Sequence, residues 1–211
     1  MPCIVNELLV RKRLSRPMVN ARKKTMLAIL ERTGQPGLGY GVEATTPDAS
    51  VYRTVLERTG LYHTDEKGGR WLAYYQLSDP GLQSVWLELT RFFNDPKEAK
   101  SPSELLSSLQ EPPFGLRFGV IPLLLTAALK AFGEAVAIRK DGVYLPDILP
   151  SDIEEFCARP ERYTVEVFKL DESQKEALVQ LVEIFGGHEY GANQELDRLR
   201  NKAEINQAAK S

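Results

Sequence analysis

The sequence has few of the residues that bind metal ions or form disulfides. Its 211 residues include two cysteines and two histidines, and the cysteines form no Cys-x-x-Cys pair and flank neither histidine. A structural zinc site needs about four ligands with local spacing, and a disulfide framework needs several cysteines, so neither is expected. We therefore expect a cytoplasmic protein without a metal ion or another cofactor.

Long hydrophobic runs are also missing. The longest apolar stretch, residues 120–129, is about half of the roughly 20 residues that a transmembrane helix needs. The N-terminal residues are apolar at first, but they lack the hydrophobic region and small-residue cleavage site of a secretory signal. We expect neither a signal peptide nor a membrane partner.

Motifs of known chemistry are absent. The glycine-rich residues 37–41 (GLGYG) match neither the Walker A pattern nor the dinucleotide-binding pattern, and no G-x-S-x-G elbow occurs. Glu154 and Glu155 would point about 100° apart on a helix, so we expect a solvated first turn and not a catalytic pair. His63 near Asp65 has no nucleophile beside it. We expect a protein without enzymatic activity.

Charge is present but unevenly distributed. Residues 1–95 carry 13 basic and 10 acidic residues, a net charge of +3, whereas the remainder carries 14 and 19, a net charge of −5. The asymmetry indicates an anionic partner for the N-terminal half, although a solvated helix face would look the same. Within the first 24 residues, one acid, Glu7, accompanies a cluster of basic residues: Arg11, Lys12, Arg13, Arg16, Arg22, Lys23 and Lys24.

Capping residues, prolines and apolar periodicity predict a mainly helical α+β fold. Helices are expected at residues 16–31, 47–59, 80–94, 102–109, 121–132, 152–159 and 171–185, with capping boxes that begin at Ser101 and Ser151. Strands are expected at 61–63, 71–75, 135–139, 143–145 and 163–170, where Asp141-Gly142 forms a hairpin turn.

Each half of the sequence places helices before a hairpin, which is the minimal order of a winged helix. We therefore predict two tandem winged-helix-like units with small β-hairpins. The first unit spans residues 1–95 with its basic N-terminus, the second spans 101–187, and a polar, helical or frayed tail spans 188–211.

The first unit is the candidate DNA-binding unit. In a winged helix the helix before the hairpin enters the major groove and the wing contacts the backbone. The helix at 121–132 of the second unit is almost wholly apolar and cannot contact base edges. We predict contacts to double-stranded DNA by Arg53 and Arg58 of the helix, by Lys67 and Arg70 of the wing, and by the basic N-terminus: Arg11, Arg13, Lys23 and Lys24.

An alternative function is that of a protein–protein adaptor or scaffold in a larger ATPase complex, without direct contact to DNA. The acidic second half and the apolar, helix-rich C-terminus favour this hypothesis. That the protein partner is an ATPase is what the resemblance described next implies.

Several segments resemble very large bacterial P-loop ATPases from phage-defence and DNA-modification loci, of the phage-exclusion or phosphorothioation type. The resemblance covers roughly residues 4–168, and its motifs consist of turn and packing residues. They are 6–9 (NELL), 50–52 (SVY) with 60–61 (GL), 112–124 (PPFGLRFGVIPLL), 141–146 (DGVYLP) and 159–162 (RPER).

The resemblance implies a winged-helix-like region that follows an ATPase core. No Walker A motif occurs in this chain. The resemblance therefore implies that this chain is a fragment or a stand-alone relative of such ATPases, and it does not imply that the chain hydrolyses ATP.

Overall fold

The computed structural model describes residues 14–66, 68–95, 100–132 and 136–168. They belong to one compact unit, which ends at Phe168. The helix expected at 171–185 and the tail at 188–211 lie outside the described residues.

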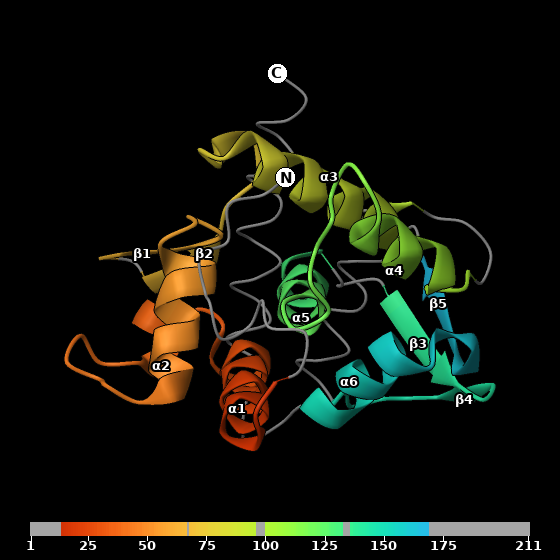
Figure 1. Ribbon diagram of the computed structural model, residues 1–211, viewed down its shortest axis with the longest axis horizontal. Coiled ribbons are helices and arrows are strands. Elements are labelled where there is room, and N and C mark those ends of the chain that lie inside the picture. The colour runs from red at the N-terminus through yellow and green to blue at the C-terminus, as the bar shows by residue number, and fades with distance from the viewer. Residues whose placement is uncertain (1–13, 67, 96–99, 133–135, 169–211) are drawn as a thin grey trace, which may run out of the picture. The chain divides into compact units, whose positions relative to one another are not determined.

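The described part is a mixed α+β fold with six α-helices and two small antiparallel sheets (Figure 1). The α-helices are α1 (Arg16–Arg32), α2 (Pro47–Tyr52), α3 (Pro80–Asn94), α4 (Ser103–Gln110), α5 (Ile121–Phe132) and α6 (Pro150–Ala158). The strands are β1 (Tyr62–Asp65), β2 (Gly68–Trp71), β3 (Val136–Lys140), β4 (Val143–Tyr144) and β5 (Tyr163–Val167).

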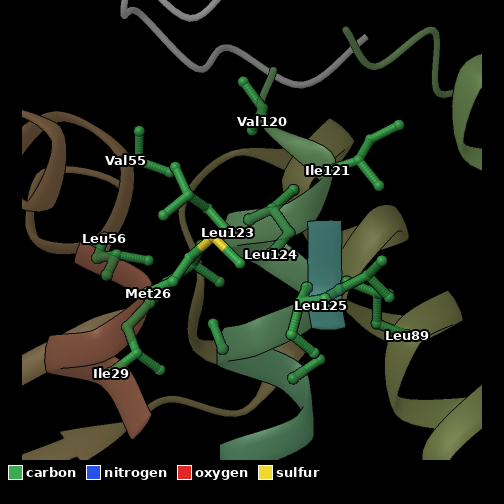
Figure 2. Packing of buried hydrophobic residues seen from close by; sticks show 14 of the residues in the cluster. Met26, Ile29, Val55, Leu56, Leu89, Val120, Ile121, Leu123, Leu124 and Leu125 are labelled. Carbon is green, nitrogen blue, oxygen red and sulfur yellow. The ribbon is translucent and has the colours of Figure 1, made fainter. Parts of the chain in front are cut away.

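Helix α5 lies at the centre of the packing (Figure 1). Its residues 121–128 are all buried, and it packs against α1, α3 and α6. Figure 2 shows Met26 and Ile29 of α1, Leu89 of α3, and Leu123, Leu124 and Leu125 of α5 in one hydrophobic cluster. The core is therefore continuous across residues 95–101, where the sequence suggested a boundary between two units.

The first sheet is the hairpin β1–β2, which pairs Tyr62 with Trp71 and Asp65 with Gly68. The strand expected at 71–75 is wrong, because β2 ends at Trp71 and a short 3₁₀ helix occupies Tyr74–Gln76. Gly68 and Gly69 are the first two residues of this strand. A Cβ at Gly69 would lie 1.8 Å from the Tyr62 hydroxyl oxygen, so only glycine fits there.

The second sheet has the strand order β4-β3-β5. Its expected hairpin is confirmed, with Asp141 (φ 50°) and Gly142 (φ 80°) in the left-handed conformation that a tight turn requires. Strand β5 adds a third member, because it pairs antiparallel with β3 and places Val165 opposite Ile138. This unit therefore carries a sheet rather than an isolated two-stranded wing.

Two helices begin with a side-chain cap at the residue before them, and two begin without the capping box expected from the sequence. The side chain of Asp79 accepts a hydrogen bond from the Leu82 amide (2.6 Å) at the start of α3, and Thr46 caps α2. The capping boxes expected at Ser101 and Ser151 do not form: α4 begins after Pro102, and α6 begins at Pro150. Helix α2 also changes at Arg53 into a π-helical segment, Arg53–Glu57.

Candidate nucleic-acid interface

Arg53, expected to contact DNA, is bound to the chain's own backbone. Its guanidinium donates to the carbonyl oxygens of Ala44 (2.5 Å), Gly41 (3.0 Å) and Val42 (2.6 Å). These three carbonyls belong to the loop that precedes α2. Arg53 is therefore a positioning residue for this loop, and two of its guanidinium nitrogens are already in use.

The other cations expected on this helix and hairpin lie in different environments. Arg58 is exposed and forms no ion pair with a described residue. Arg70 is paired with Asp65 across the hairpin (2.7 Å), where Glu66 is also exposed. Lys67 lies outside the described residues. The described part of the β1–β2 hairpin therefore has no excess of positive charge.

A basic surface lies instead on the exposed side of α1. Arg16, Asn20 and Lys24 follow one another at intervals of four residues, and all three are exposed. Lys23 lies beside them on the same face at helical spacing, with 41% of its side chain exposed. We call Arg16, Asn20, Lys23 and Lys24 the α1 ridge. The first turn of α1 holds no acid, and the acid on this face, Glu31, lies at the other end.

The ridge agrees in part with the residues expected from the sequence. Lys23 and Lys24 were expected to contact DNA, whereas Arg11 and Arg13 lie outside the described residues. Arg16 was included in the basic cluster but not among the expected contacts. Its spacing of eight residues from Lys24, two helical turns, is the signal that places it on the same face.

Glu154 of α6 joins two neighbouring cations of α1. One carboxylate oxygen lies 2.7 Å from the Arg22 guanidinium, and the other lies 3.0 Å from the Lys23 ammonium. Arg22 is buried and also donates to the carbonyl oxygen of Gly119 (3.2 Å). The solvated first turn expected for Glu154 is therefore wrong, because a charged side chain on a distant helix requires it.

Glu155 points away from Glu154 and belongs to another ion network. It pairs with Lys140 (2.5 Å) and with Arg162, which also pairs with Asp141 of the hairpin turn. The hydrogen bond from Lys140 holds the pKa of Glu155 below its ordinary value. Every described cation of the second hairpin is thus neutralised locally, since Arg139 also pairs with Glu166 (3.0 Å).

Exposed apolar side chains accompany this neutralised hairpin. Val143 and Tyr144 of β4 are 68% and 52% exposed, and Leu149, just before α6, is 54% exposed. We call these three residues the β4 apolar group. Val143 and Tyr144 are neighbours on the edge strand β4, and Leu149 follows five residues later. Contiguous apolar patches often mark protein contacts, whereas single exposed residues do not.

The described residues offer few groups for catalysis or for metal binding. They contain no cluster of three histidine, cysteine, aspartate or glutamate side chains that could hold a metal ion. Burial raises the pKa of the Cys157 thiol to about 12, which keeps it protonated and unreactive. A shallow hollow on α4 is lined by Ser103, Glu104, Ser107, Ser108, Glu111 and Pro112.

Among the described helices, none has both the length and the apolar character that crossing a membrane requires. Comparisons with models of protein families, with curated proteins and with solved structures found no match. The resemblance to the large bacterial ATPases therefore stays a prediction.

Proposed function

We propose that this chain is a non-enzymatic module of a bacterial defence or DNA-processing assembly, and that it engages the backbone of double-stranded DNA. The observation that carries the proposal is the α1 ridge, where three cations share one exposed helix face. The helix–hairpin order of the first half, which resembles a winged helix, supports the same proposal.

The geometry of the ridge suits phosphates. A helix rises about 1.5 Å per residue, so Arg16 and Lys24 are separated by about 12 Å along α1. Phosphates of one DNA strand recur about every 3.4 Å along the duplex axis, so side chains at this separation can reach different phosphates. The N-terminal end of α1 adds the positive end of its helix dipole.

The proposed contact is to the backbone and not to base edges. The α1 ridge carries two lysines, one arginine and one asparagine. Contacts from such flexible cations to phosphates fix the position of a protein on a duplex but do not read its base sequence. The helix expected to read bases, α2 with its π-helical continuation, has its Arg53 committed to the preceding loop. We therefore expect binding with little sequence preference.

Titration of a labelled duplex at several salt concentrations tests the proposal. Three phosphate contacts predict that log K falls with log salt at a slope of about −2.7, since each contact contributes about −0.9. Lys24→Gln is expected to make the slope shallower by about 0.9. Arg91→Gln, which removes an exposed arginine from the last turn of α3, is the matched control and is expected to leave the slope unchanged. A flat slope for the unmodified protein would refute the proposal.

A second candidate function is that of a protein–protein adaptor, which the β4 apolar group favours. Three exposed apolar side chains beside a hairpin without free charge would suit a protein surface better than DNA. Sedimentation velocity with a candidate ATPase tests this function. Val143→Ser with Tyr144→Ser should abolish co-sedimentation, whereas Lys24→Gln should not; co-sedimentation that survives the double variant would exclude this surface.

A further inference from the structure

We infer that Glu154 competes with DNA phosphates for Lys23 and thereby limits the affinity of the α1 ridge. This inference rests on the proposed function and names the group that regulates the same site. It assigns to an acid of α6, outside the predicted DNA-binding half, a direct influence on that half.

The competition follows from the two partners of one carboxylate. Glu154 is held 2.7 Å from Arg22, whose side chain is only 7% exposed. A buried guanidinium needs an opposite charge, so this carboxylate cannot be withdrawn without leaving Arg22 uncompensated. Its second oxygen then lies 3.0 Å from the Lys23 ammonium, at the surface.

Lys23 differs from its neighbour Lys24 in this respect. Lys23 is 41% exposed and already has an anionic oxygen at the distance a phosphate oxygen would take. Lys24 is exposed and has no ion-pair partner among the described residues. A phosphate can therefore bind Lys24 directly, but it can bind Lys23 only after it displaces the Glu154 carboxylate.

The size of the effect follows from the exposure of the pair. Surface ion pairs contribute at most about 1 kcal/mol, which corresponds to about a fivefold change in an equilibrium constant. Removal of the competing charge is therefore expected to strengthen duplex binding about two- to fivefold at low salt. The change must depend on Lys23, and this dependence separates competition from a general change in net charge.

The experiment compares Glu154→Gln with Glu161→Gln in duplex titrations at low salt. Both variants remove one acid, but Glu161 is exposed and pairs with no described cation. Glu154→Gln is expected to bind about two- to fivefold more tightly than Glu161→Gln, because only it frees Lys23. In a Lys23→Gln background the difference should disappear, as a double-mutant cycle requires for a direct pair.

The outcomes separate this inference from the proposed function. Binding by the unmodified protein with equal affinities for Glu154→Gln and Glu161→Gln would overturn the inference and leave the function standing. Binding by Glu154→Gln alone would support the inference, whereas no binding by any variant would overturn both.

A further comparison leaves the buried pair intact, in case the loss of charge beside Arg22 prevents folding of Glu154→Gln. Lys23→Gln should weaken duplex binding about two- to fivefold less than Lys24→Gln does, because Lys23 must first leave Glu154. Equal losses from the two substitutions would overturn the inference. Tryptophan fluorescence during urea unfolding shows whether each variant is folded.

Discussion

Leu124→Ala tests whether the two predicted units share one folding transition. Leu124 lies in α5, within the predicted second unit, and its side chain is fully buried among residues of both halves. Removal of a buried leucine side chain destabilises a protein by about 3 kcal/mol, through lost transfer free energy and the cavity that remains. For a domain of this size, that corresponds to a decrease in Tm of about 6–12 °C.

The natural probes for this experiment lie on the other side of the predicted boundary. Trp71 and Trp86 belong to residues 1–95. The ring centroid of Trp86 lies 5.2 Å from the ring centroid of Phe132, which ends α5. If the core is shared, tryptophan fluorescence must report the full loss of stability caused by Leu124→Ala.

Leu149→Ala is the matched control for this change. It makes the same chemical substitution at a side chain that is 54% exposed, so we expect it to lower the free energy of unfolding by less than about 1 kcal/mol. The reasoning would be refuted if Leu124→Ala left the fluorescence transition unchanged while circular dichroism revealed a second, earlier transition. In that case residues 1–95 would unfold independently of α5.

Three further predictions concern single sites. Gly69→Ala should lower the free energy of unfolding by about 1–3 kcal/mol in urea titrations, because the added Cβ would collide with the Tyr62 hydroxyl, whereas Gly41→Ala, with open space at its Cβ, should be nearly neutral. Thiol titration should find no difference between the native protein and Cys157→Ser, and a difference should emerge on unfolding, because burial keeps this thiol protonated and inaccessible. Burial and the nearby Glu57 raise the pKa of Tyr52 from 10.0 to about 12, so the folded state retains a proton that the unfolded state loses. Stability should therefore be unaffected by this tyrosine below pH 10 and should fall as the pH rises toward 12, which urea titrations at several pH values would measure.

Elements with strong local signals could be predicted from the sequence. Helix α5 occupies the expected residues, because Pro122 fits its first turn and the leucines and alanines that follow are strong helix formers. The start of α3 follows from the Asp79 cap, and the second hairpin follows from Asp141-Gly142, where both residues need a positive φ. Each of these signals acts within a few residues of the chain.

Elements determined by distant contacts could not be predicted in the same way. Strand β2 begins at Gly68 because the adjacent glycine must lie against Tyr62 and Gln35, which only the folded arrangement reveals. The function of Glu154 depends on Arg22, 132 residues earlier in the chain. For the same reason, only part of the candidate site could be predicted. The charge composition indicated the basic segment, but only the packing showed that the Arg53 guanidinium is bound to backbone carbonyls of the loop before α2.

The position of Arg53 means that the loop before α2 carries its own permanent cation. Three converging backbone carbonyls resemble the ligand set of a bound metal ion, but here a covalently attached guanidinium fills that position. A guanidinium is not deprotonated in proteins and cannot diffuse away. The shape of this loop should therefore be indifferent to chelators, to the ionic composition of the medium and to pH across the physiological range.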